Sequence, residues 1–150
     1  MIDVNDLTPD HGNIYLWWGD ITKLKVDDIV NAVNSKLLRC FVPNHNCIDN
    51  VIHLWTGVQL WLVCSQLMLE QGHDEPTGQT KITSAFNLPA KYILHTVDPI
   101  IIGQVSQKAK DLLVSCYQSC LDLVIKNRWS LFPKTCCYHS TWSFPKNQYS

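Results

Sequence analysis

The sequence predicts a layered α/β fold built on a largely parallel β-sheet. Short segments rich in strand-forming residues alternate along the chain with longer segments whose apolar residues recur at helical spacing. Strands that alternate with helices form parallel sheets covered by those helices. The 150 residues suffice for one domain spanning 1–150. We therefore expect a small-molecule site at the carboxyl ends of the strands, where such sheets bind ligands.

Two strands and a long helical region are expected in the first half of the chain. Residues 14–18 form an apolar run that predicts the first strand, and residues 28–33 predict a second. The asparagines of the second strand need partners if they are buried. An irregular loop spans 35–47, and helical spacing then runs through 48–68, with Gly72 as the expected stop.

The second half predicts two further strands, at 82–86 and 92–97, followed by a helix. An apolar stripe from Ala109 to Val124 predicts the helix, and Ser106 is its expected N-cap. Residues 129–132 are a further strand candidate.

Composition excludes several classes of protein. The net charge is −1 and 17% of the residues are charged, which does not indicate a nucleic-acid binder. We expect no membrane partner, because no run approaches the ~18 apolar residues of a membrane span. The acidic start lacks the features of a signal peptide, so we expect a cytoplasmic protein.

Seven cysteines without an export signal do not predict a disulfide framework. Two of them, Cys40 and Cys47, form a loop cluster with His45, which lies between them; two thiols and an imidazole are ligand types that Zn²⁺ accepts. Three protein ligands resemble an open catalytic zinc site. A distant residue such as His53 would close the site and make it structural, and the cluster could also be incidental.

Three polar residues near the predicted strand ends admit two interpretations each. Asp20 is suited to cap a helix through its side chain, or to accept a hydrogen bond from the exocyclic amine of a base. Asn31 and Asn34 are suited either to bridge loops or to hydrogen-bond ribose hydroxyls. For Asp20 the local sequence favours the helix cap, and for Asn31 and Asn34 it does not choose between the two roles.

Several motifs together resemble the macrodomains, which are α/β/α modules that bind ADP-ribose. The strings GDIT at 19–22 and VDDIVNAVNS at 26–35 resemble the family signature. The string RCFVPNHNCIDNVIH at 39–53 resembles the zinc-containing bacterial macrodomains that remove ADP-ribose from acidic side chains of proteins. The likeness continues through GQTKIT at 78–83 and YILHTV at 92–97, and covers most of the chain.

The resemblance implies a three-layer α/β/α sheet and a set of site residues. Asp20 would receive the adenine amine, with the backbone of Ile21 beside it, and Asn34 would orient the distal ribose as the catalytic positioning residue. The remaining implied roles are ligand binding by Asn31, zinc binding by Cys40, His45 and Cys47, and phosphate binding by Ser140 and Thr141.

The implied function is zinc-dependent hydrolysis of the ester between ADP-ribose and an Asp or Glu side chain. The implied partners are ADP-ribose and mono-ADP-ribosylated proteins of lipoate-linked metabolism. The alternatives are a non-catalytic module that binds ADP-ribose and an inactive truncated fragment. Zinc content, release of ADP-ribose and affinity for ADP-ribose separate these three.

The chain also departs from the family pattern. The string STWSFP at 140–145 lacks the glycines of the family's phosphate loop, which supply positive φ and room beside the phosphates. Trp18, Trp55 and Trp61 are expected to overpack the core, at ~1–3 kcal/mol each. The family's last strand and helices are missing, so we expect a C-terminally truncated domain.

Overall fold

A four-stranded sheet forms the centre of the molecule. The computed structural model describes residues 2–3, 18–40, 47–101, 103–127 and 136–137. The strand order is β4-β5-β3-β6. These strands are β3 (Asp28–Val33), β4 (Thr80–Ser84), β5 (Tyr92–Val97) and β6 (Cys136–Cys137). β3 is parallel to β5 and β6, whereas β4 is antiparallel to β5, so the expectation of a largely parallel sheet is confirmed.

The two central strands, β3 and β5, pair along their whole length, from Asp28 opposite Tyr92 to Val33 opposite Val97. Side chains alternate between the two faces of a strand. One face of the pair therefore carries Ile29, Val33, Ile93 and Val97, and the opposite face carries Val30 and Leu94. Both faces carry buried apolar residues, because helices cover both of them.

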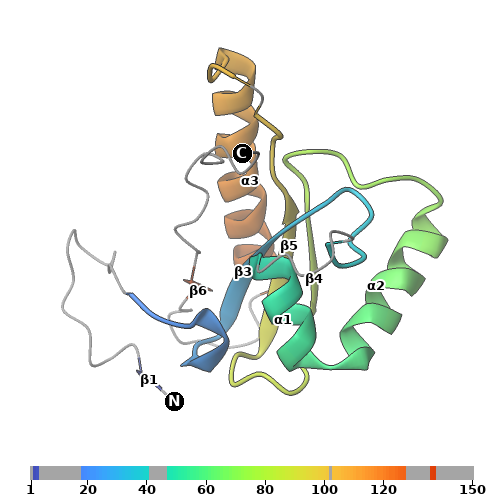
Figure 1. Cartoon of the computed structure of the whole chain (residues 1–150), viewed down its shortest axis with the longest axis vertical. Coiled ribbons are helices and arrows are strands. Elements are labelled where there is room, and N and C mark those ends of the chain that lie inside the picture. The colour runs from blue at the N-terminus through green and yellow to red at the C-terminus, as the bar shows by residue number, and fades with distance from the viewer. Residues whose placement is uncertain (1, 4–17, 41–46, 102, 128–135, 138–150) are drawn as a thin grey trace, which may run out of the picture.

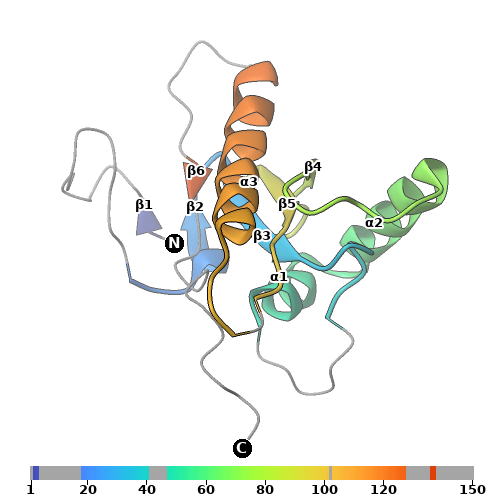
Figure 2. The ribbon, with the colours of Figure 1, turned by 90° about the horizontal axis from the view of Figure 1, so that it is seen from above.

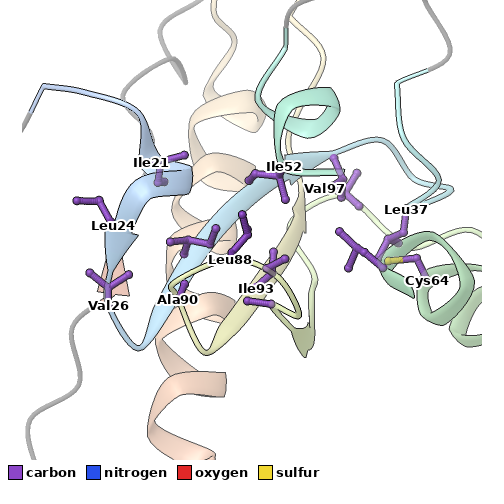
Figure 3. Close-up of a cluster of buried hydrophobic side chains, with 14 residues drawn as sticks. Ile21, Leu24, Val26, Leu37, Ile52, Cys64, Leu88, Ala90, Ile93 and Val97 are labelled. Carbon is purple, nitrogen blue, oxygen red and sulfur yellow. The ribbon is translucent and has the colours of Figure 1, made fainter. Parts of the chain in front are cut away.

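Helices cover the two faces of the sheet, as the three-layer prediction requires. α1 (Ile48–Thr56) and α2 (Val58–Gln71) pack on the first face through Ile52, Leu60 and Cys64. α3 (Gln107–Lys126) packs on the other face through Cys120 and Val124. Figures 1 and 2 show α3 on the side of the strands opposite to α1 and α2. Figure 3 shows the larger core, where Ile52 lies above the sheet residues Ile93 and Val97.

Glycine ends both helices of the first face. Gly57 separates α1 from α2 at a bend of 113° and has a φ of 94°. A Cβ atom there would lie 2.9 Å from Asn87 Nδ2 and Gln59 Oε1, two side-chain ends that can move, so the main requirement for glycine is the backbone conformation of φ 94° and ψ 179°. Gly72 ends α2 in the left-handed conformation, as predicted. In the described part of the chain no single helix is long and apolar enough to span a membrane. Only the bent pair of α1 and α2, taken together, has the length and composition of a span.

A second, smaller sheet lies ahead of β3. β1 (Ile2–Asp3) pairs in parallel with β2 (Leu24–Lys25), which follows the short 3₁₀ helix η2 (Ile21–Lys23). The sequence did not predict this pair. The strand expected at 14–18 lies outside the described residues except for Trp18, which is not in a strand.

Two expectations about the fold are wrong. The strand expected at 82–86 lies at Thr80–Ser84, because Thr80 pairs with Thr96 at one end and a turn at Ala85 to Leu88 closes the other. The tryptophans do not overpack the core: Trp18, Trp55 and Trp61 are 95%, 58% and 44% exposed. The candidate strand at 129–132 lies outside the described residues.

Candidate functional site

The sequence-predicted residues gather at the end of β3. Asn34 directly follows this strand, and Cys47 directly precedes α1, which contacts both β3 and η2. Asp20 directly precedes η2. His45, Ser140 and Thr141 lie outside the described residues, so their roles stay predictions.

Asp20 is the N-cap of η2, which confirms its predicted capping role. Its Oδ1 accepts hydrogen bonds from the Thr22 backbone N–H at 3.0 Å and from the Thr22 hydroxyl at 2.6 Å. The Thr22 hydroxyl is the main cause that lowers the pKa of Asp20, and Lys23 adds to it. Its Oδ2 lies 3.8 Å from Lys23 Nζ, and the side chain is 38% exposed. The carboxylate is thus ionised, held in place and accessible to a ligand. Its contact with an adenine amine stays a prediction.

Asn34 organises the turn that follows β3. Its Nδ2 donates to the carbonyl oxygen of Arg39 at 3.2 Å, and its Oδ1 accepts from the backbone N–H of Lys36 at 2.9 Å. The turn contains two non-glycine residues with positive φ, Leu37 at 53° and Arg39 at 40°. The positive φ at Arg39 is a conformation that glycine enters without steric cost, whereas arginine does not. The bridging role predicted for Asn34 is confirmed, and ribose binding stays a prediction.

The loop after α2 holds the same turn from the other side. Asp74 accepts a hydrogen bond from the Ser35 hydroxyl at 3.2 Å and forms an ion pair with Lys36 Nζ at 2.6 Å. The backbone N–H of Glu75 donates to the carbonyl oxygen of Ser35 at 2.8 Å. The segment that carries Asn34 is therefore tied to a part of the chain about forty residues away.

Cys40 and Cys47 lie close together, as the zinc prediction requires. Burial is the main cause that raises the pKa of Cys47, and a hydrogen bond with the Cys40 side chain raises it further. Both residues are partly exposed and neither forms a disulfide. Two soft thiol donors at one point fit Zn²⁺. No group of three His, Cys, Asp or Glu side chains that could hold a metal occurs among the described residues, and His53 thus does not complete such a set with the two thiols.

Sequence reasoning missed a buried polar cluster between β3, β5 and α1. Asn31 is fully buried, and its Nδ2 donates to Asp49 Oδ1 at 2.9 Å and lies 3.4 Å from His95 Nδ1. His53 Nε2 lies 3.4 Å from the same Asp49 oxygen. The available signal was the i, i+4 spacing of Asp49 and His53, which places both on one face of α1. Asn31 thus connects α1 with β5 rather than two loops, and its contact with a ligand stays a prediction.

Burial controls the charge of this cluster. It raises the pKa of Asp49 from 3.8 to about 6, opposed first by the hydrogen bond from Asn31. It lowers the pKa of His53 from 6.5 to about 4 and that of His95 from 6.5 to about 3. At neutral pH both imidazoles are therefore neutral and Asp49 carries the charge. Asp98, at the end of β5, also has a pKa raised by burial.

Comparison with known proteins identifies the family. The family model described as "Macro domain" matches residues 30–143, which include most of β3, both helices of the first face and α3. This chain belongs to the macro domain family. The fold-class prediction is thereby confirmed.

Relatives and solved structures of macro domains resemble this chain closely. It is 53% identical over 135 residues to a protein-ADP-ribose hydrolase of Treponema medium, covering 90% of this chain and 52% of the relative. It is 47% identical over 148 residues to the protein of that name from Staphylococcus aureus strain MSSA476, covering 97% and 56%. This macro domain thus spans about half the length of these curated relatives.

Two solved structures share the arrangement of the elements. The Oceanobacillus iheyensis macrodomain with ADP matches with a TM-score of 0.70 and 34% identity, over 85% of this chain and 65% of that one. The Trypanosoma brucei macrodomain in complex with ADP-ribose matches with a TM-score of 0.67 and 33% identity, over 83% and 50%.

Proposed function

We propose that this macro domain hydrolyses the ester that joins ADP-ribose to an Asp or Glu side chain of a mono-ADP-ribosylated protein, with the help of Zn²⁺. The proximity of Cys40 and Cys47 carries the proposal, because a pair of thiols beside the Asn34 turn is suited to a metal ion at the distal end of a nucleotide. The names of relatives at 53% and 47% identity support the same activity.

The described residues would each perform a positioning task. The ordered carboxylate of Asp20 would accept a hydrogen bond from the adenine amine beside Ile21. Asn34, fixed by its bonds to Lys36 and Arg39, would orient the distal ribose so that the ester faces Cys40 and Cys47. Orientation of a reacting group contributes several kcal/mol, up to about 7–11 in well-oriented cases.

The metal would be held by Cys40, His45 and Cys47. When bound, Zn²⁺ would supply Lewis-acid chemistry by polarising an oxygen of the scissile ester. Hydrolysis adds one water across the bond between the anomeric carbon and the carboxylate oxygen. The target protein regains its carboxylate, and the released ADP-ribose carries a hydroxyl group on the anomeric carbon.

The test follows the intact mass of a target protein that carries ADP-ribose on Asp or Glu. We expect loss of the modification with the zinc-loaded protein, and no loss with a chelator or with Cys40→Ala. Cys64→Ala is the matched control, because Cys64 is a fully buried thiol in α2, far from the loop in sequence. Its release rate should stay within about twofold of the parent protein.

The same experiment distinguishes hydrolysis from binding alone. ADP-ribose affinity measured by calorimetry, without any release from the target, would replace our proposal with a binding module. A protein that folds and binds zinc but shows neither property would refute both functions. We call the segment from Cys40 to Cys47 the metal loop. Release of ADP-ribose at the full rate by Cys40→Ala would refute the role of this loop.

We further propose a cytoplasmic location and modified proteins of lipoate-linked metabolism as substrates. The family resemblance supports the substrate class, and the net charge of −1 gives no reason to expect nucleic acid as a partner. Faster release from a modified lipoyl carrier protein than from an unrelated carrier with the same linkage would support this substrate class. Equal rates would exclude a preference.

A further inference from the structure

A line of hydrogen-bonding side chains crosses three strands of the sheet and ends at α1. Thr83 Oγ1 lies 2.8 Å from His95 Nε2, His95 Nδ1 lies 3.4 Å from Asn31 Nδ2, and Asn31 Nδ2 lies 2.9 Å from Asp49 Oδ1. The line runs from β4 through β5 and β3 to the first turn of α1. All four residues are buried, with exposures of 5%, 0%, 0% and 4%. We call Thr83, His95, Asn31 and Asp49 the polar line.

The polar line has one possible direction of donation. An amide Nδ2 only donates, so His95 Nδ1 must accept from Asn31. In a neutral imidazole the other nitrogen then carries the proton, and His95 Nε2–H donates to Thr83 Oγ1. The two hydrogens of Asn31 Nδ2 are thus directed to His95 and to Asp49. The donor-only Nδ2 of Asn31 therefore fixes the tautomer of His95, and Thr83 Oγ1 accepts the remaining imidazole proton. His95 Nδ1 in turn holds the rotation of the Asn31 amide.

The far end of the polar line reaches both ends of the metal loop. Asp49 lies two residues after Cys47, and its carboxylate also accepts a hydrogen bond from the backbone N–H of Cys40. The buried carboxylate of Asp49 therefore connects Cys40, at the start of the loop, with the first turn of α1, which directly follows Cys47. Arg39 and His53 face the same carboxylate, but neither connects it to the sheet.

We infer that His95 is a positioning residue, which acts through Asn31 to hold Asp49 in the orientation that keeps Cys40 beside Cys47. The inference rests on the metal loop of the proposed function and extends it to residues in the centre of the sheet. Asn31 Oδ1 is buried and has no hydrogen-bond partner among the described residues, so the two acceptors of its Nδ2, on Asp49 and His95, are what holds the amide in one orientation. The polar line would thus preorganise the two thiols before a metal arrives.

The test compares two threonine variants that each remove one buried hydroxyl. Thr83→Val cuts the polar line at its first bond. Thr96→Val is the matched control: Thr96 is fully buried in β5, but its hydroxyl donates to the carbonyl oxygen of Gln79 at 3.1 Å and it is adjacent to His95 on the opposite face. Thermal denaturation establishes that both variants fold.

Two readouts report the loop rather than general stability. The first is zinc affinity from competition with a chelator. The second is the rate at which Cys40 and Cys47 of metal-free protein form a disulfide with diamide, the oxidant that takes up the two thiol hydrogens, followed by peptide mass. We expect Thr83→Val to lower zinc affinity about 10-fold, as loss of an outer contact to metal ligands does. The disulfide should form several-fold more slowly, and Thr96→Val should change neither quantity.

Two variants of His95 provide an independent measurement. His95→Leu should lower both readouts at least as far as Thr83→Val, and His95→Gln should restore most of the loss because glutamine keeps one donor and one acceptor. Equal effects of Thr83→Val and Thr96→Val, or no rescue by glutamine, would overturn the inference. The disulfide rate can be measured in a protein without hydrolase activity. If the variants change this rate as expected but the parent protein releases no ADP-ribose, the proposed function is refuted and the inference about His95 is not.

Discussion

The buried imidazole of His95 makes a strong prediction about acid stability. The perturbation is His95→Gln, which removes the titrating group but keeps a donor and an acceptor. The unfolded chain binds this proton below pH 6.5, whereas the folded protein binds it only near pH 3. The contribution of His95 to stability is therefore complete above pH 6.5 and is lost progressively as the pH falls.

The magnitude follows from the difference between the two pKa values. Between pH 6.5 and 4.5 the unfolded chain is protonated at this site and the folded protein is not. Each pH unit changes the free energy of unfolding by about 1.4 kcal/mol per proton, so two units remove about 3 kcal/mol. No screening correction applies, because His95 is fully buried.

The assay is urea denaturation of metal-free protein at pH 7 and pH 4.5, followed by tryptophan fluorescence. The quantity compared is the loss of unfolding free energy between the two pH values, which should be about 3 kcal/mol larger in the parent than in His95→Gln. Asp49 and His53 titrate in both proteins, and because the charge of His53 also lowers the pKa of His95, the difference measures His95 together with this coupling. Equal acid losses in the two proteins would refute the neutral, buried state of His95, and with it the tautomer assigned to the polar line.

Three further substitutions test other features of the fold. Asp20→Ala should lower the free energy of unfolding by about 1 kcal/mol through loss of the cap, measured by urea denaturation; an unchanged midpoint would contradict the capping role. Trp61→Gln on the exposed side of α2 should change it by less than about 0.5 kcal/mol, whereas Leu60→Ala beside it should cost about 2–5 kcal/mol. Gly57→Ala should cost clearly more than Gly72→Ala, because Gly57 has φ 94° and ψ 179°, a region that essentially only glycine occupies, whereas Gly72 has the ordinary left-handed conformation; similar melting temperatures of the two variants would contradict this backbone argument.

Local pattern was sufficient for the elements whose sequence and burial agree. The bounds of β3 and β5 match the prediction, because both are short segments rich in apolar and β-branched residues and are buried on two faces. α3 begins where Ser106 predicted it, and the Ser106 hydroxyl accepts from the backbone N–H of Ala109 at 3.2 Å. Asp20, Asn34, Cys40 and Cys47 could also be selected in advance, since motif and spacing single them out.

Other features depended on contacts between distant parts of the chain. The start of β4 is set by its pairing with β5, and the exposure of Trp55 and Trp61 is set by which side of each helix meets the sheet. α2 is apolar on several sides, so periodicity alone did not distinguish its buried residues from its exposed ones.

The polar line shows the physical reason most clearly. Its amide and imidazole are 64 residues apart, and its amide and carboxylate are 18 apart. A sequence pattern reports which residues are apolar and how they repeat, but it does not report which buried polar group will face which other. The sequence alone therefore determined the fold class and the residues at the strand ends. The packing of three strands against α1 determined that Asn31 and Asp49 become one hydrogen-bonded unit.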